Sequence, residues 1–345
     1  MHHSISFIML TIMWFASSAF ADNARFCVQV LDVETGMPVK DVYVRGTFES
    51  RYPRWENATE FSDFSTKTGI DGRLYFSGET NCGEAGFRID KSEFHYGAPW
   101  IDVPYEKKRK LPFTWWQPDN IVITVLLQRI ERPIPLFVKQ LFSRGSDSVC
   151  SNYFDIGKGK MEFDLMKGSF LPPIGKGEYA DICFTRLERE DLGIGSTFRG
   201  YIKMPAYRDV MTVEFLGDGN GLIEIPSKKT DGIKIRTAPL DGYKADYLVT
   251  KGKDKSVKYF TSSNPDRNFA FRIRTKKDAD GKIVSAYYGK IYGDIEIKKP
   301  YGVEELVAAP SFMYYLNPKP LDRNLEWDMK NNLCPNPGSL SQPMP

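Results

Sequence analysis

The sequence feature that most constrains the fold is the stretch 26–46, in which two apolar alternations flank a short turn. Val28 and Val30 alternate with polar residues, which is typical of a strand with one buried face. Residues 34–38 interrupt this pattern with Gly36, which tolerates a positive φ, and Pro38, which fixes the exit of the turn. A second alternation follows and ends at Gly46. The stretch therefore predicts a strand–turn–strand unit of an antiparallel sheet.

Similar patterns recur along the chain. Residues 68–73 form a second turn signal that is followed by an apolar strand, and residues 48–64 predict a long loop between the two strand–turn–strand units. Residues 121–127 are the most apolar predicted strand, expected to be buried on both faces. Further strands are predicted at residues 162–165, 179–184, 210–215, 222–225, 269–273 and 283–297. We therefore predict an all-β chain of two antiparallel β-sandwich-like domains.

The length and composition fit that organisation. With 345 residues, 41% of them hydrophobic, the chain is long enough for two domains with proper cores. A net charge of +3 argues against a dedicated nucleic-acid-binding protein. The predicted parts are a signal peptide (1–21), a first β-sandwich (22–130), a Pro-rich connector (131–144), a second β-rich domain (145–330) and a Pro-rich tail (331–345).

The N-terminus predicts export. Residues 4–21 are apolar and end in Ala19-Phe20-Ala21, a small-x-small cleavage signature, so the mature chain is expected to begin near Asp22. The apolar run is too short for a comfortable membrane span, although an uncleaved anchor is the alternative. No later stretch is apolar enough to span a bilayer. We expect a periplasmic or extracellular protein without a transmembrane span once the leader is removed.

Export places the cysteines in an oxidising compartment. Cys27 and Cys82 are the two cysteines of the first domain, and we predict a disulfide between them. The pairing of Cys150, Cys183 and Cys334 stays open, because an odd total leaves at least one thiol without an intramolecular partner.

Catalytic signals are sparse. His95 is the single histidine outside the leader, which excludes a multi-histidine zinc site and leaves one candidate base for Ser-His or Cys-His chemistry. We predict no catalytic residue, no metal and no cofactor, with a carboxylate-dependent hydrolase as an alternative reading. Residues 278–281 superficially resemble a calcium loop but lack its later ligands, so they predict a plain hairpin turn.

Aromatic and basic residues near the end of the first domain are the strongest binding signal. Exposed tryptophans can stack on sugar rings, and a basic run can attract a polyanionic glycan or an anionic membrane surface. The competing interpretation is an apolar loop that caps one end of the sandwich. The candidate binding residues are Trp100, Lys107, Lys108, Arg109, Trp115 and Trp116. Arg267, Arg272, Arg274 and Lys276 are instead expected on the solvent face of a strand.

Residues 28–39, with Thr35-Gly36 and Pro38, and residues 68–76, with Asp71-Gly72, resemble carboxypeptidase-regulatory-like and transthyretin-like β-sandwich modules. The resemblance covers about a third of the chain and implies an accessory or cell-surface module. The zinc-binding His-x-x-Glu of the peptidase partners is absent, so catalysis is not carried over.

The second half is similar to a group of uncharacterised secreted bacterial proteins. The residues that carry this similarity are Pro133–Pro135, Phe163–Leu165, Pro173–Gly177, Ala180–Asp181, Phe271–Thr275, Tyr315–Pro318 and Asp322–Leu325. We expect an exported, non-catalytic binding or scaffolding protein of the bacterial cell envelope. Its expected partner is a cell-envelope protein or polysaccharide, and the alternative is a carbohydrate-binding protein that uses Trp115 and Trp116.

Overall fold

The computed structural model confirms the all-β prediction: the residues that it describes form 24 strands and no helix. It follows that they contain no helix long and apolar enough to cross a membrane. The structure describes residues 23–51, 59–80, 82–95, 101–103, 105–110, 113–117, 119–141, 154–155, 160–186, 189–196, 203–225, 235–264, 266–298, 307–335 and 337.

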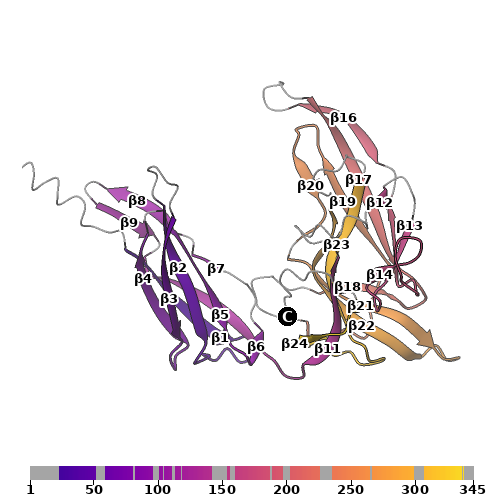
Figure 1. The fold of residues 1–345 in the computed structure, drawn as a ribbon, viewed down its shortest axis with the longest axis horizontal. Coiled ribbons are helices and arrows are strands. Elements are labelled where there is room, and N and C mark those ends of the chain that lie inside the picture. The colour runs from indigo at the N-terminus through magenta and orange to yellow at the C-terminus, as the bar shows by residue number, and fades with distance from the viewer. Residues whose placement is uncertain are drawn as a thin grey trace, which may run out of the picture. The chain divides into compact units, whose positions relative to one another are not determined.

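The chain divides into two compact units, the first ending at Arg129 and the second beginning at Ile130. Each unit is described by itself, and Figure 1 labels most of their strands. The strands of the first unit are β1 (Asn23–Asp32), β2 (Tyr43–Arg51), β3 (Thr59–Lys67), β4 (Arg73–Glu79), β5 (Glu84–Asp90), β6 (Phe94–His95), β7 (Ile101–Asp102), β8 (Glu106–Lys110), β9 (Phe113–Gln117) and β10 (Ile121–Arg129).

The first unit is a sandwich of two four-stranded sheets, ordered β4-β1-β10-β6 and β3-β2-β5-β7, with β8 and β9 as a separate hairpin. Side chains from both sheets form one core, because inward-facing residues alternate with outward-facing ones along each strand. Phe26 of β1 lies at its centre, with its ring 5.7 Å from those of Phe48 and Phe87 on the opposite sheet. Most pairs are antiparallel, but β1 and β10 are parallel.

The strand–turn–strand prediction for residues 26–46 is wrong in its pairing. The turn at 34–38 exists, but β1 and β2 lie in different sheets, and the turn at 68–72 likewise carries the chain from β3 to β4 of the other sheet. The true hairpin is β2–β3, paired without interruption from Tyr43↔Lys67 to Arg51↔Thr59. Much of the predicted loop at 48–64 is therefore strand. β10 is also half-exposed on its outer face, with Val122 50% exposed, because only two layers are present.

The second unit contains fourteen strands. They are β11 (Ile134–Leu141), β12 (Phe154–Asp155), β13 (Lys160–Asp164), β14 (Ser169–Phe170), β15 (Ile182–Arg186), β16 (Glu190–Ser196), β17 (Lys203–Phe215), β18 (Gly221–Ile225), β19 (Asp246–Lys253), β20 (Tyr259–Thr261), β21 (Asn268–Lys277), β22 (Ile283–Lys298), β23 (Val307–Leu316) and β24 (Trp327–Asn332).

These strands form two seven-stranded sheets that share one large core. One runs β18-β21-β22-β23-β11-β24 with β12 beside β23, and the other runs β14-β13-β15-β17-β19-β20 with β16 beside β17. Residues 134–141, within the predicted connector, form β11, which pairs antiparallel with β23 and parallel with β24.

The β18–β24 sheet is buried on both faces. Phe269, Phe271 and Ile273 face the main core, whereas Ala270 belongs to a second cluster with Tyr288 and Leu325. A third cluster around Tyr315 and Trp327 covers the same outer face further along. The prediction of a solvent face is therefore wrong for Arg272, which is only 7% exposed and donates to the carbonyls of Gly219 and Leu240, whereas Lys276 is exposed as predicted.

Candidate interaction surface

One side of the first unit is formed by two outer strands, β3 and β4, and we call it the open side. Within the part of the chain that the structure describes, each of these strands pairs with a neighbour on one edge only, β3 with β2 and β4 with β1. All residues of β3 are exposed except the half-buried Phe64, and Tyr75 of β4 is 64% exposed. The outer edge of a strand presents backbone N–H and C=O groups that another strand can bind.

The open side is held in a fixed geometry from within. The rings of Phe64 and Phe76 meet between the two sheets, with centroids 4.0 Å apart. Gly46 of β2 lies opposite Phe64, and a Cβ there would collide with the Phe64 ring and with the carbonyl oxygen of Gly86. Thr68 fixes the end of β3, because its hydroxyl donates to the Val39 carbonyl at 2.8 Å. The edge strands are thus preorganised rather than loose.

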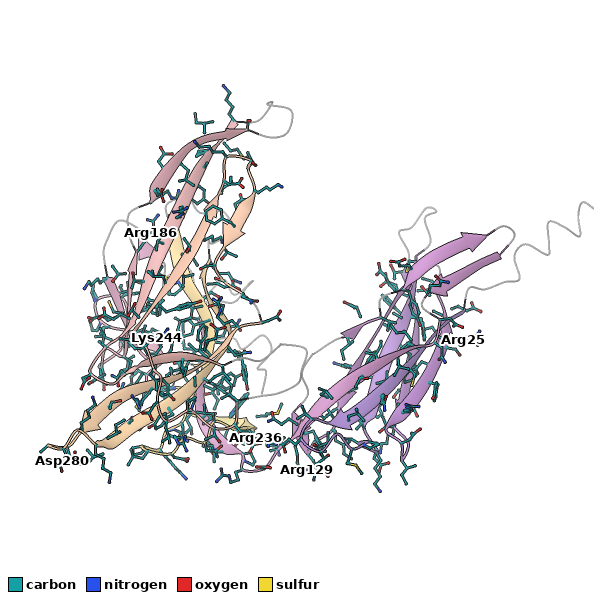
Figure 2. The ribbon with its side chains drawn as sticks, turned by 180° about the vertical axis from the view of Figure 1, so that it is seen from behind. Arg25, Arg129, Arg186, Arg236, Lys244 and Asp280 are labelled. Carbon is teal, nitrogen blue, oxygen red and sulfur yellow. The ribbon has the colours of Figure 1, made fainter. Side chains whose placement is uncertain are left out.

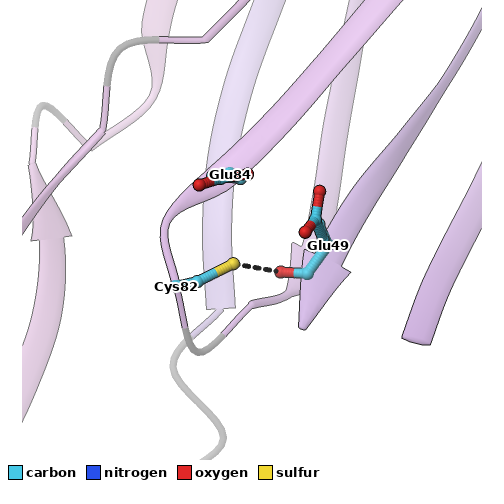
Figure 3. A group of neighbouring side chains, drawn as sticks. All are labelled: Glu49, Cys82 and Glu84. Atoms are coloured by element: carbon cyan, nitrogen blue, oxygen red, sulfur yellow. Dashed lines mark hydrogen bonds between the residues drawn. The ribbon is translucent and has the colours of Figure 1, made fainter. Parts of the chain in front are cut away.

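A shallow hollow lies on the outer face of the β3-β2-β5-β7 sheet. Its volume is 310 Å³, and it is lined by Thr47, Glu49, Gly83, Glu84, Ala85, Gly86, Asp102 and Val103. At its rim Glu49, Glu84 and Cys82 bring three potential ligand atoms within 4.8 Å of one another (Figure 3). The Cys82 thiol donates to the Glu49 backbone carbonyl at 3.0 Å. Two carboxylates and a hydrogen-bonded thiol are three ligand residues of mixed type, one fewer than the four of a structural zinc site.

The predicted Cys27–Cys82 disulfide is not formed, and both residues are free thiols. In the pairing of β1 with β4, Asn23 lies opposite Glu79. Cys27 is four residues further along β1, so it lies about 13 Å from the Asn23–Glu79 pair. Cys82 comes after Glu79 and bonds to β2 of the other sheet. Bridged cysteines need Cα atoms within about 7 Å. Burial also raises the pKa of the Cys27 thiol.

Five of the six predicted binding residues lie in one hairpin. Lys107 pairs with Trp116 and Lys108 with Trp115 across β8 and β9, and Arg109 pairs with Thr114. Trp100 and Cys150 lie outside the described residues. His95 lies in β6, opposite Gln128 of β10. The backbone therefore gathers the basic run and the tandem tryptophan, which are separate in sequence, into one element.

Buried ion pairs in the second unit are the polar feature that sequence reasoning missed. In the first, which we call the Arg274 clamp, Arg274 of β21 donates to both oxygens of Asp181 at 2.8 Å and to Asp164 at 2.9 Å. Arg274 lies in one sheet, whereas the two aspartates adjoin β15 and β13 of the other. The clamp therefore joins the two layers.

Backbone geometry aims Arg274 into this position. By alternation it belongs with Ala270 and Arg272, which face the outer side of the sheet. A register shift between Ile273 and Lys276 and a φ of 50° at Arg274 turn the side chain inward. A bulge of this kind re-aims one residue without ending the strand.

Asp164 is saturated with donors. Its carboxylate accepts backbone N–H groups from Met166, Lys167, Glu178 and Tyr179, each at 3.0 Å, in addition to Arg274. Burial alone raises the pKa of Asp164, but these hydrogen bonds and the guanidinium charge outweigh it and hold the pKa below its ordinary value.

A second cluster, the Asp294 clamp, joins the sheets at β22 and β19. The Asp294 carboxylate accepts from the Tyr247 hydroxyl at 3.0 Å, from the Arg267 guanidinium at 2.8 Å and from the Asn264 N–H at 2.8 Å. Burial raises the pKa of Asp294 despite these donors, and burial together with the Asp294 charge raises the pKa of Tyr247 to about 12. In both clamps the charged side chains form their hydrogen bonds with other groups inside the second unit.

No protein-family model and no curated protein matches the chain. Solved structures with partial similarity include a streptococcal ancillary pilin, at 12% identity and a TM-score of 0.21, and the shaft pilin SpaA of Lactobacillus rhamnosus GG, at 9% and 0.19. BcpA, the major pilin subunit of Bacillus cereus, follows at 9% and 0.20. The aligned regions cover 58%, 75% and 84% of this chain and 55%, 89% and 95% of those chains, so the chain spans about half the length of the streptococcal protein. TM-scores near 0.2 are too low to support an argument about fold or function.

Proposed function

We propose that this chain is an exported, non-catalytic binding or scaffolding protein of the bacterial cell envelope, and that the open side is its docking surface. The observation that carries the proposal is β3, a nine-residue outer strand that contains no proline and pairs with β2 without a register shift. Export rests on the leader that the sequence predicts at residues 1–21, which lie outside the described residues.

The unpaired backbone groups of such an edge can themselves form a binding site. An extended strand from a partner can add to it, and the main-chain hydrogen bonds then supply affinity while alternate side chains supply specificity. Natural sheets block unwanted pairing with short outer strands, prolines or bulges. β3 has none of these three features. Phe61, 60% exposed on its outer face, provides an apolar contact for an added strand.

The interior of the second unit supports a structural role. The Arg274 and Asp294 clamps place buried carboxylates under several donors each, which holds the sheets in one arrangement and leaves these groups engaged. A carboxylate-dependent hydrolase, the less favoured alternative, has its nearest counterpart in the hollow that is lined by Glu49, Glu84 and Asp102.

The test is a pull-down from the organism's own cell envelope with the mature chain as bait, identifying captured proteins and glycans. We expect Phe61→Lys to abolish capture, because it replaces the exposed apolar contact of the docking strand with a charge. Val122→Lys, on the outer face of the opposite sheet, is the matched control and should leave capture unchanged. Equal capture by both variants would reject the open side as the docking surface.

A carbohydrate-binding function is the second candidate, favoured by the pairing of Lys107 with Trp116 and Lys108 with Trp115 in one hairpin. Retention of the mature chain on immobilised polysaccharide, lost in Trp115→Ala and Trp116→Ala, is the expected result. Retention that both substitutions leave unchanged would dismiss this function without affecting the proposal for the open side.

A further inference from the structure

We propose that the partner of the open side is the open side of a second copy, with β3 pairing antiparallel to β3 and β4 antiparallel to β4 about one two-fold axis. This inference rests on the proposed function, since it takes β3 and β4 as the docking edges. Both sheets of the sandwich would then continue across the axis into the second copy.

The residues of β3 are self-complementary when the axis passes through Phe64. Lys67 then faces Phe61 of the second copy, and the diagonal neighbour of Lys67 is Asp63. Directly opposite residues in an antiparallel pair lie about 5 Å apart, and diagonal ones about 7–8 Å, within reach of a lysine. Moving the axis to Asp63 would set two identical carboxylates opposite each other. The register through Phe64 avoids this repulsion and, by symmetry, places Lys67 of each copy diagonally beside Asp63 of the other.

The residues of β4 are self-complementary about Phe76. Arg73 and Glu79 stand three residues on either side of it, so each faces its opposite charge on the second copy. Tyr75 faces Ser77 in the same register. Both Arg73 and Glu79 are exposed, and like Tyr75 and Ser77 they alternate with the inward-facing Phe76. A two-fold pairing of β4 therefore forms two further ion pairs.

The two pairings demand the same axis. A two-fold axis that relates antiparallel strands within a sheet runs perpendicular to that sheet, so in a sandwich it passes through both layers. The axis position in β3 is Phe64 and that in β4 is Phe76, and their ring centroids lie 4.0 Å apart across the sandwich. The charge patterns of β3 and β4 thus give the same position for the two-fold axis. A chance complementarity in one strand alone would not produce this agreement.

The expected interface is small. Seven paired residues extend about 23 Å, and a sandwich about 10 Å thick with its outer side chains is about 20 Å across, which gives roughly 460 Å² per copy. Stable interfaces bury about 800 Å² per partner. We therefore expect a dimer that forms and dissociates with concentration rather than a permanent one.

Sedimentation velocity of the mature full chain, from about 10 μM to about 1 mM, measures this association. We expect Arg73→Glu to weaken it about tenfold, because two attractive pairs become repulsive. Adding Glu79→Arg to Arg73→Glu restores opposite charges across the axis and should restore the dimer. Arg88→Glu, exposed on the inner strand β5, is the matched charge-reversal control and should have no effect.

A chain that stays monomeric up to 1 mM, or a dimer that is insensitive to Arg73→Glu, would overturn the inference. A weakened dimer that the second substitution does not rescue would also overturn it, because the proposed register requires the two residues to meet. If the chain is monomeric yet envelope capture is lost in Phe61→Lys, the proposed function stands and the partner is a different molecule.

Discussion

Replacing Val257 with glycine is expected to stabilise the second unit, because Val257 occupies the strained position of a tight turn. Its φ is 62°, in the left-handed region that β-branched residues rarely adopt. The turn joins β19 to β20. It closes with the Asp254 N–H donating to Lys258 at 2.9 Å and the Val257 N–H donating to Asp254 at 3.0 Å.

The β21–β22 hairpin supplies an internal control, since it uses the same turn with Gly281 at the equivalent position. There the Asp278 N–H donates to Lys282 at 3.0 Å and the Gly281 N–H to Asp278 at 3.1 Å, with φ at 77°. In each turn the first aspartate carboxylate also accepts from the backbone N–H groups two and four residues further on. Figure 2 shows Asp280 at the tip of this hairpin. The predicted plain hairpin turn at 278–281 is confirmed.

The magnitude follows from two opposing effects. A residue with a Cβ in the left-handed region costs about 1–2 kcal/mol, and a branched one lies at the upper end. Glycine removes that cost but loses about 0.5–1 kcal/mol through the greater freedom of the unfolded chain. Val257→Gly should therefore gain about 1 kcal/mol. Gly281→Val should lose a similar amount, and it does so through φ alone, because no atom lies within 4 Å of the added Cβ.

Urea unfolding and calorimetry of the mature chain measure both variants. About 1 kcal/mol corresponds to a shift of about 2–4 °C in the melting temperature of a unit of this size. Val257→Asn separates strain from lost packing, since asparagine keeps a Cβ but tolerates positive φ. If Val257→Gly and Val257→Asn both destabilise while Gly281→Val is silent, the turn is not strained and the reasoning fails.

Three further predictions concern the packing at Gly46, the Arg274 clamp and the buried Asp209. Gly46→Ala should destabilise the first unit by about 3 kcal/mol, because overpacking against Phe64 cannot relax; its urea midpoint is the measurement. Arg274→Met should cost about 3–5 kcal/mol by leaving a buried carboxylate unpaired, whereas Lys277→Met, which breaks an exposed pair, should leave the same midpoint unchanged. Burial alone raises the pKa of Asp209, but hydrogen bonds from two arginines hold it below its ordinary value. The ionised Asp209 carboxylate therefore stabilises the folded state above about pH 4, and this stabilisation is lost as the pH falls through the lowered pKa. In urea titrations between pH 2.5 and 6, Asp209→Asn should flatten this acid dependence, and an unchanged slope would contradict the assignment.

Apolar alternation predicts several of the strands, though not β3, and it does not predict which strands pair. Residues 283–297 were expected as a strand, and β22 spans Ile283–Lys298. The turns at 34–38 and 68–72 show what the pattern lacks. Glycine and proline specify that the chain reverses, yet a reversal can return to the same sheet or cross to the other one. That choice depends on distant strands such as β10, whose residues pair with residues of β1 that lie 95 positions earlier in the sequence.

The basic residues of β21 show the same limit for the polar interior. Arg272 and Arg274 alternate with apolar residues, which is the ordinary sign of a solvent face. Arg272 is enclosed because residues from 235–243 and 317–327 form an outer layer over the sheet, whereas Arg274 is turned by the bulge into the space between the two sheets. The acceptors of Arg274, Asp164 and Asp181, lie 110 and 93 residues earlier in the sequence. A local pattern carries no information about partners at that separation.

The distribution of bulges between the two units bears on the open side. Among the described strands, the second unit interrupts its ladders at β16, at β21, within β22 and between β11 and β24, and its other outer strands are at most five residues long. In the first unit β3 and β4 pair over nine and seven residues without interruption. Long regular edges promote indiscriminate strand addition unless their side chains restrict the register. The charges of β3 and β4 provide that restriction, because Lys67, Asp63, Arg73 and Glu79 find opposite charges together in one arrangement. In the proposed dimer, the regular edges of the open side would therefore allow strand addition, and their charges would favour a single register.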